Sequence, residues 1–559
     1  MTDRTPATFL TGASRAERLF PTLTPAQVER IAVHGRVRPI RRGEVLVEAG
    51  DTVVPFFVVR AGQIEIVLPS EGREELVAVH GPGQFTGEVQ LLSGRRALVR
   101  ARASEPGEVI ELDRERLLTL VQTDSELSEL IMRAFILRRV ELIAHGFGDV
   151  VLLGSNHCSG TLRVKEFLTR NSHPYSYVDL DHEANVQELL DRFHVGTADV
   201  PILICRGEQV LRNPTNQQIA ECLGFNEAID ASQVHDLVVV GAGPSGLAAA
   251  VYGASEGLDV LVIEVSAPGG QAGSSSKIEN YLGFPTGISG QALAARAYTQ
   301  AQKFGAKVVI AKEARKLACK RKPYAIEIDD GVTVPARSVV IATGAAYQRP
   351  PLDELARFEG AGVYYGATFM EAQLCRGEEV VVVGGGNAAG QAAVFLAQTA
   401  KRVHMLVRSG GLAASMSRYL IRRIEQNPAI VLRTHTELVA LEGGGALERV
   451  RWHNRQDART ETQEIRHVFL MTGAVPNTRW LDRCVALDEK GFIKTGPDLS
   501  KADLDAAHWP LARVPHLLET SLPGVFAVGD VRAGNIKRVA SAVGEGSIAV
   551  AFVHQVLHE

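Results

Sequence analysis

The sequence predicts a multidomain protein: a small β-roll with flanking helices, a small α/β module, and two larger α/β domains, one inserted in the other. Three observations lead to this prediction. The 559 residues are enough for three or four domains. Short alternating strands separated by glycine turns fill the stretch from Arg36 to Leu112. A glycine-rich unit of strand, turn and helix occurs twice, at Gly241 and at Gly384.

Composition excludes several classes of function. A hydrophobic content of 45% and a charged content of 22% are ordinary for a soluble globular protein. The formal net charge of −4 predicts no basic face, so we expect no nucleic acid partner. No apolar run approaches the roughly 20 residues that span a bilayer, and the N-terminus has no signal-peptide core. We therefore expect no membrane span and a cytoplasmic location.

The cysteines form no recognisable motif. The sequence has six, without a C-x-x-C pair or the spacing of metal ligands: Cys158, Cys205, Cys222, Cys319, Cys375 and Cys484. This scatter predicts neither a disulfide scaffold nor a metal site.

Residues 1–147 are expected to form the β-roll domain, with a helix starting at Thr24-Pro25 and another from about Arg114 to His145, where apolar residues follow helical spacing. The stretch GPGQFTGEVQLLSGRRALVRARA resembles a cyclic-nucleotide-binding domain. The resemblance implies a phosphate-binding cassette formed by Gly87-Glu88 and a downstream arginine, with Glu88 at the ribose 2′-hydroxyl and Arg95 or Arg96 at the cyclic phosphate. The segment is shorter than the family's. The alternative is a roll that serves packing or dimerisation.

Residues 148–225 are expected to form the small α/β module. Expected strands are Val150 to Leu153, Tyr175 to Asp179 and Pro201 to Cys205, and expected helices are Leu162 to Thr169, Asn185 to Phe193 and Asn216 to Leu223, with a hairpin through Arg206-Gly207. This order resembles the thioredoxin and glutaredoxin fold, and Val200-Pro201 matches that family's cis-proline. Cys158-Ser159-Gly160-Thr161 lies where the family has C-x-x-C. Because Thr161 replaces the second cysteine, Cys158 has either a structural or docking role or that of a single thiol activated by the helix N-terminus.

Residues 226–235 are a predicted linker, and a dinucleotide site follows. Leu237 to Val240 is a β-branched strand, and Gly241, Gly243 and Gly246 complete G-x-G-x-x-G before a helix of small residues. These glycines permit the turn, the approach of a pyrophosphate and close helix packing, so that the anion meets the helix N-terminus. Glu264 ends the next strand, where an acid accepts hydrogen bonds from ribose hydroxyls.

The second unit has the same pattern with the opposite charge at its end. Gly384, Gly386 and Ala389 take the glycine positions, and the second strand is expected to end at Arg408. A carboxylate repels a 2′-phosphate, whereas a guanidinium holds one through charge-assisted hydrogen bonds. The sequence therefore predicts two Rossmann-like domains, with FAD in the first and NADPH, in preference to NADH, in the second. The predicted NADPH positions are Gly384, Gly386, Asn387, Ala388, Ala389 and Arg408.

From Asp236 to the C-terminus, the chain resembles the low-molecular-weight thioredoxin reductase family. The resemblance rests on GGQAGSSSKIENYLGFP (Gly269 to Pro285), IATGA (Ile341 to Ala345), TSLPGVFAVGD (Thr520 to Asp530) and the start of the last helix. It implies an FAD domain of 236–348 and 479–559, with the NADPH domain, 349–478, inserted. We also expect a homodimer. The FAD positions that the motifs and the resemblance imply are Gly241, Gly243, Pro244, Ser245, Gly246, Glu264, Gly270, Gln271, Asn280, Thr343, Gly344, Gly529, Asp530, Arg538, Val539 and Ala540.

The chain departs from this family at its redox pair. Gly366 and Phe369 stand where members that reduce thioredoxin carry two cysteines just before the NADPH glycines. Cys375 is close in sequence but has no partner, and we expect it to be a buried small hydrophobe.

The favoured interpretation is an oxidoreductase in which hydride passes from NADPH to flavin and on to a non-dithiol acceptor of unknown identity, a small molecule or a redox protein. The chemistry is centred on the flavin, so no catalytic acid or base is expected, and Lys537 and Arg538 are candidates for tuning it. One alternative is a thioredoxin-disulfide reductase, which turnover of thioredoxin would favour. The other is a ligand or redox sensor, which tight ligand binding with negligible turnover would favour.

Overall fold

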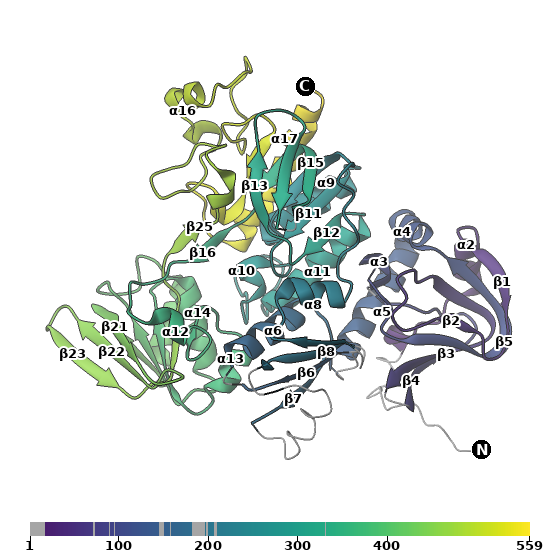
Figure 1. Ribbon diagram of the computed structural model, residues 1–559, viewed down its shortest axis with the longest axis horizontal. Coiled ribbons are helices and arrows are strands. Elements are labelled where there is room, and N and C mark those ends of the chain that lie inside the picture. Colours follow the sequence, from purple (N-terminus) through teal and green to yellow (C-terminus); the bar gives the residue numbers. More distant parts are fainter. Residues whose placement is uncertain are drawn as a thin grey trace.

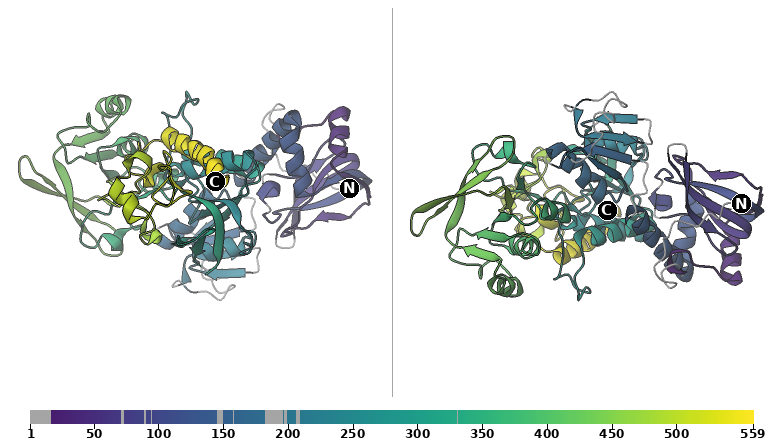
Figure 2. Two further views of the ribbon diagram at one scale, coloured as in Figure 1. Left: turned by 90° about the horizontal axis from the view of Figure 1, so that it is seen from above. Right: turned by 90° about the horizontal axis from the view of Figure 1, so that it is seen from below.

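The computed structural model describes residues 17–70, 73–88, 90–93, 95–144, 150–156, 158–181, 196, 199–205, 209–329 and 331–559. Figure 1 shows an elongated molecule with the roll at one end and the inserted α/β domain at the other. The other large α/β domain, called the central domain below, and the small module lie between them. The two additional views in Figure 2 show the same separation of the ends.

The N-terminal domain is an antiparallel roll, as predicted. Its strands are β1 (Arg36–Ile40), β2 (Val45–Val47), β3 (Phe56–Ser70), β4 (Arg73–His80) and β5 (Arg100–Leu112), in the order β1-β5-β3-β4 with β2 on β5. Its helices are α2 (Pro25–Ala32), which Thr24 caps, α3 (Gln90–Ser93), α4 (Arg114–Thr123) and α5 (Ser125–Ala144). The rings of Phe56, Phe85 and Phe135 pack together and join α5 to the roll.

The helix predicted from Arg114 to His145 is two helices. Asp124 leaves the helical conformation, with φ −109° and ψ 103°, and its carboxylate accepts a hydrogen bond from the Leu127 N–H at 3.0 Å. An aspartate that caps the next helix competes with continuation of the first, which apolar periodicity does not reveal.

The small module has a four-stranded sheet in the order β7-β6-β8-β9. Its elements are β6 (Val150–Gly154), α6 (Ser159–Arg170), β7 (Ser176–Asp179), β8 (Ile202–Cys205), β9 (Gln209–Arg212) and α8 (Asn216–Cys222). β6 and β7 are parallel, β8 and β9 antiparallel, and the Val200–Pro201 peptide is cis. The predicted helix from Asn185 to Phe193 and the turn at Arg206-Gly207 lie outside the described residues. The assignment to the thioredoxin fold stays a prediction.

The central domain is a seven-stranded sheet whose parallel part is buried on both faces. The strands are β10 (His235–Val240), β11 (Val260–Glu264), β12 (Lys307–Ile310), β13 (Ala314–Ala318), β14 (Tyr324–Ile328), β15 (Thr333–Ile341) and β26 (Val525–Ala527). Val238 and Val240 face one apolar cluster, whereas Leu237 and Val239 face the other. Burial on both sides explains why β10 reads as a continuous apolar run. Helices α9 (Pro244–Ser255), α10 (Gly270–Gly273) and α11 (Gly290–Lys303) follow its strands.

The C-terminal segment completes this domain, because β26 pairs with β15 in parallel and α17 (Val539–Leu557) packs on α9. Among the described residues, α17 alone is long and apolar enough to cross a bilayer by length and composition. The expectation that no apolar run approaches the length of a bilayer span was therefore wrong for α17. Ala549, Val550 and Val553 are fully buried in the domain core, so α17 has the features of a core helix.

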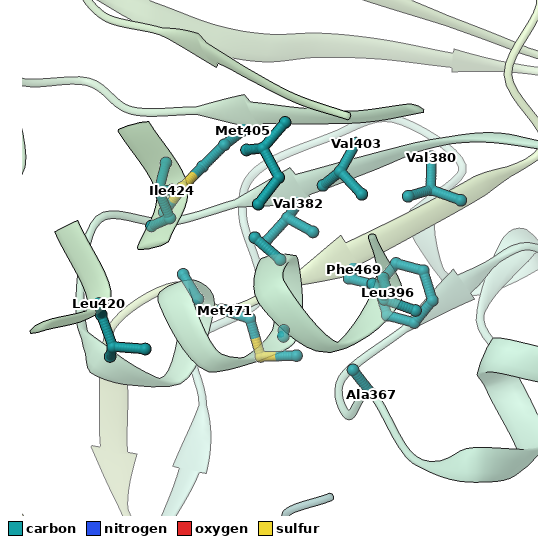
Figure 3. Packing of buried hydrophobic residues seen from close by; sticks show 14 of the residues in the cluster. Ala367, Val380, Val382, Leu396, Val403, Met405, Leu420, Ile424, Phe469 and Met471 are labelled. Atoms are coloured by element: carbon teal, nitrogen blue, oxygen red, sulfur yellow. The ribbon is translucent and has the colours of Figure 1, made fainter. Parts of the chain in front are cut away.

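The inserted domain has a five-stranded parallel sheet, β17-β24-β18-β19-β20, and a three-stranded antiparallel sheet, β21-β22-β23. The strands are β17 (Val363–Tyr364), β18 (Glu379–Val383), β19 (Arg402–Leu406), β20 (Ile430–Arg433), β21 (Thr436–Glu442), β22 (Arg449–Asn454), β23 (Arg459–Gln463) and β24 (His467–Leu470). The helices are α12 (Leu355–Phe358), α13 (Phe369–Leu374), α14 (Asn387–Leu396) and α15 (Arg418–Gln426). Figure 3 shows Val382, Phe469 and Leu396 gathered between the sheet and α14. The paired strands β16 (Ala345–Tyr347) and β25 (Ala474–Pro476) carry the chain into and out of this domain.

The structure corrects the prediction of no disulfide framework. Cys205 pairs with Cys222 inside the small module, and Cys319 pairs with Cys484. The second pair joins the two sequence segments of the central domain. The partners are 17 and 165 residues apart, so only folding brings them together.

Candidate active site

The first glycine turn forms an open anion cradle at the start of α9. A Cβ on Gly241, whose φ is +103°, would lie 2.4 Å from the Ala342 carbonyl oxygen, so the turn requires glycine. Gly243 is the N-cap of α9 and supplies no side-chain cap. The first N–H groups of the helix are therefore available to a pyrophosphate. Pro244 and Ser245 open the helix, and Gly246 packs on the turn.

Glu264 lies at the end of β11, beside this turn. Its carboxylate accepts hydrogen bonds from the N–H groups of Ala242 at 2.7 Å, Ser266 at 2.9 Å and Ala267 at 3.1 Å. Burial raises the pKa of Glu264, and the three N–H donors oppose that rise. The donors fix the carboxylate next to the cradle, which fits an acid that meets an adenosine ribose.

Two distant segments close around the same turn. The Gln271 amide donates to the Ala345 carbonyl, which brings Gly270 and Gln271 beside Thr343 and Gly344. A Cβ on Gly529 would lie 2.5 Å from the Ser245 hydroxyl, so Gly529 and Asp530 adjoin the start of α9. Burial raises the pKa of Asp530, while Lys537 opposes that rise. Asn280 and Arg538 are exposed, and Arg538, Val539 and Ala540 open α17.

Glu545 of α17 organises this loop, and the motifs did not reveal it. Its carboxylate accepts hydrogen bonds from the Gly529 N–H at 2.7 Å, from Arg532 at 2.6 Å and from Asn535 at 2.8 Å. The acid sits in a small-residue helix 15 positions beyond Asp530, where only the folded loop shows what it contacts.

The second glycine turn forms a matching cradle in the inserted domain. A Cβ on Gly384, with φ +142°, would lie 2.3 Å from the Met471 carbonyl oxygen. Gly386 is the uncapped N-cap of α14, with open space around it. Asn387 at the first helical position accepts a hydrogen bond from the Ser417 N–H at 2.8 Å, and Ala388 and Ala389 continue the helix.

Arg408 is exposed beside this second cradle. Strand β19 ends at Leu406, so Arg408 stands two residues beyond the strand rather than at its last position. Among the described residues, none forms an ion pair with Arg408. Its guanidinium is therefore available to an anionic ligand.

An ion pair links the inserted domain, which contains the second cradle, to the central domain, which contains the first. Arg423 of α15 pairs with Glu279, next to Asn280. Burial would raise the pKa of Glu279, but hydrogen bonds from Arg423 and Lys277 hold it below its usual value. The pair is one contact between the inserted domain and the central domain.

The segment that we expect to correspond to the family's redox pair, Gly366 to Phe369, has no cysteine. Gly366 precedes α13, whose capping box uses Thr368 and Glu371, and Phe369 is 69% exposed. Cys375 is fully buried, as expected, and burial raises the pKa of its thiol to about 12. This thiol is unreactive at neutral pH.

Helix α6 of the small module contacts both larger domains. Its N-cap is Cys158, which is half-buried, and a Cβ on Gly360 would lie 2.7 Å from the Ser159 Cβ. At its other end, Arg170 donates to the Gly270 carbonyl at 2.8 Å and Asn171 to the Ser266 carbonyl at 3.2 Å. These contacts place the module against the first cradle, which no sequence motif indicated.

The cassette predicted in the roll is turned toward this same helix. Glu88 pairs with Arg139 at 3.8 Å, and Arg139 donates to the Ser172 carbonyl. The backbone of Gly87 packs on Leu91 and Phe135. Arg95 is 5% exposed and donates to the Asn171 carbonyl at 3.4 Å and to the Tyr298 hydroxyl at 3.2 Å. Arg95, one of the two candidate phosphate arginines, therefore takes part in the contact between domains, and Glu88 pairs with an arginine that also does.

Comparisons with known proteins agree with this arrangement. Residues 235–546 match the model of the family described as pyridine nucleotide-disulphide oxidoreductase, and residues 37–124 match the cyclic nucleotide-binding domain. Thioredoxin reductase of Treponema pallidum is 32% identical over 56% of this chain and 94% of its own. NADPH-dependent thioredoxin reductase 3 of Arabidopsis thaliana is 30% identical over 61% of this chain and 64% of its own.

A solved structure gives the same result. The crystal structure of T. acidophilum thioredoxin reductase covers 58% of this chain and 99% of its own, at 29% identity and a TM-score of 0.52. The family model spans more than half of the chain and includes both cradles. The chain therefore belongs to the pyridine nucleotide-disulphide oxidoreductase family, with a cyclic nucleotide-binding domain at its N-terminal end.

Proposed function

We propose that the protein oxidises NADPH through FAD and passes the electrons to an acceptor that is not a dithiol. FAD and NADPH are the cofactors of this thioredoxin reductase-like family, and the chain is an FAD-dependent pyridine-nucleotide oxidoreductase. The observation that carries the proposal is the pair of open glycine cradles combined with Gly366 and Phe369 at the positions of the redox cysteines.

The residues of each cradle fit their cofactor. The uncapped N-termini of α9 and α14 would each hold a pyrophosphate. Glu264 would accept from the ribose of FAD, and Arg408 would pair with the 2′-phosphate of NADPH. Bound together, the two cofactors supply hydride transfer from nicotinamide to flavin.

A second candidate is a thioredoxin-disulfide reductase, because the relatives carry that name. Such a reductase needs two thiols that exchange with the substrate disulfide. Cys205 and Cys222 are a pair, but both are buried, at 1% and 6% exposure. Burial keeps them from a protein disulfide in this conformation, so we favour the non-dithiol acceptor.

Three further features belong to the proposal. We propose a homodimer, a cytoplasmic location and regulation by the N-terminal domain. A sensor with little turnover remains the alternative of a different class.

The test is anaerobic titration of the purified full-length protein with NADPH, followed by a panel of acceptors: ferredoxin, a quinone, dioxygen and thioredoxin. Flavin bleaching followed by turnover with a non-thiol acceptor is the expected result. Bleaching with turnover of thioredoxin alone would establish the second candidate. A flavin that NADPH does not bleach would contradict both enzyme assignments.

A further inference from the structure

A cavity of about 850 Å³ lies between the roll and the segment that leaves the small module. Its walls on the roll side come from β1, the loop at 52–55, α3, the end of β5 and α4. Its other wall is Gly224, Asn226, Glu227 and Ala228. This volume is within the range of small-molecule sites. Arg95 and Arg96 of the predicted cassette are part of its lining, whereas Glu88 is not.

The charge of the cavity is positive because two arginines lack carboxylate partners. The lining has five arginines and three carboxylates. Arg114 pairs with Glu227, Arg36 lies 3.8 Å from Glu111, and Arg116 lies 3.5 Å from Asp113. These contacts use all three carboxylates. Among the described residues, Arg95 and Arg96 form no ion pair, and they supply the remaining two positive charges.

Arg95 is a buried cation with unused hydrogen-bonding capacity. Its guanidinium stacks on the Phe225 ring, 4.3 Å from the centroid, and its Nε is buried with no hydrogen-bond partner among the described atoms. An unpaired buried charge is costly, and an anion that enters the cavity would offset that cost. Arg96 lies over Gly224, where a Cβ would come within 2.7 Å of its Nε.

Apolar groups accompany the two arginines. Val53, Val54, Pro55 and Leu91 line the same cavity. A ligand with an anionic head and a flat or apolar body matches this combination, because the head would contact the arginines and the body would contact the apolar residues.

We propose that this cavity binds a phosphate ester of mononucleotide size, with the phosphate on Arg95 and Arg96 and the body against the apolar wall. The site uses the arginines of the predicted cassette but not its glutamate. It therefore requires no 2′-hydroxyl contact at Glu88, and a linear 5′-monophosphate satisfies it.

The test is calorimetric titration of the full-length protein with AMP, cyclic AMP and inorganic phosphate at one fixed salt concentration. Arg96→Gln and Arg95→Gln should each weaken AMP binding about tenfold, the loss of one charge-assisted contact. Arg133→Gln is the matched control. It removes a positive charge from an exposed side chain of α5 that does not line the cavity. It should leave AMP affinity unchanged.

Glu88→Gln distinguishes this site from the cassette. Unchanged AMP affinity in Glu88→Gln is the expected result. Loss of nucleotide binding in Glu88→Gln with retention in Arg96→Gln would place the ligand in the cassette and overturn the proposal. Absence of AMP binding at millimolar concentration would also overturn it. Because Arg95 is part of the contact between domains, thermal unfolding must show that the Arg95→Gln variant is folded. If it is not folded, Arg96→Gln alone tests the proposal.

Discussion

Arg408 determines the choice between the two nicotinamide cofactors, if the second cradle holds NADPH as proposed. Arg408→Ala should weaken NADPH binding by about 1.5–3 kcal/mol, roughly ten- to a hundredfold, because one charge-assisted contact with the 2′-phosphate is lost. NADH affinity should change little. Arg402→Ala is a matched control, because Arg402 is an exposed arginine at the start of the same strand. Equal losses for both cofactors in a fluorescence titration of Arg408→Ala would refute the assignment.

The two unpaired cysteines should differ sharply in reactivity. Burial raises the pKa of Cys375 to about 12, so at pH 7 the thiol is protonated. This pKa lies above the usual value, so the thiolate forms only as the pH rises toward 12. Iodoacetamide should modify half-buried Cys158 in the native protein and Cys375 only after unfolding. Mass spectrometry that finds Cys375 alkylated in the native protein would contradict its burial.

At the scale of elements, the end of α6 contacts the central domain through hydrogen bonds, one of which a single substitution at Arg170 removes. Arg170→Ala deletes the donor to the Gly270 carbonyl, so the loop that precedes Gln271 loses its hydrogen bond with Arg170. Loss of one such bond costs about 0.5–1.5 kcal/mol, so FAD affinity should fall about two- to tenfold. The measurement is the FAD dissociation constant of the reconstituted apoprotein.

Arg163→Ala is the control for this prediction. Arg163 is also on α6, but it donates to Asn216 and to the Pro214 carbonyl within the small module. Its loss should lower the stability of the module and leave FAD affinity unchanged. An equal loss of FAD affinity in the two variants would show that α6 acts only through the stability of its own module.

Elements with a local sequence signal were predictable, and those defined by distant contacts were not. Strand β10, the turn at Gly241 and helix α9 follow from a continuous β-branched run, glycine geometry and small residues within one short stretch. The break at Asp124 was missed because a capping aspartate interrupts a pattern that otherwise continues. The disulfide between Cys319 and Cys484 was missed because the two residues meet only when the split domain closes.

The candidate site divides in the same way. Gly384 and Arg408 could be predicted as NADPH positions from their spacing, since the unit of strand, turn and helix is contiguous, and these assignments stay predictions. Glu545 and Arg170 were not, because each acts on a loop that is remote in sequence. Arg95 could be proposed as a phosphate arginine by its residue type alone, but the direction of its side chain, toward Asn171 and Tyr298, depends on how three domains pack.

For the whole molecule, the central claim is that electrons leave the flavin without an internal dithiol. A relay through thiols needs a thiolate that attacks and a second thiol that resolves the mixed disulfide. Gly366 and Phe369 supply neither, and Cys158 and Cys375 lie in different domains, both unpaired. The Cys158→Ser, Cys375→Ser double variant removes both unpaired thiols at once.

The most direct measurement compares the wild-type protein with this double variant for NADPH consumption, first with a quinone and then with thioredoxin. We predict equal quinone turnover in the two forms and no reduction of thioredoxin by either. Thioredoxin reduction by the wild-type protein, whether lost or retained in the double variant, would contradict the claim.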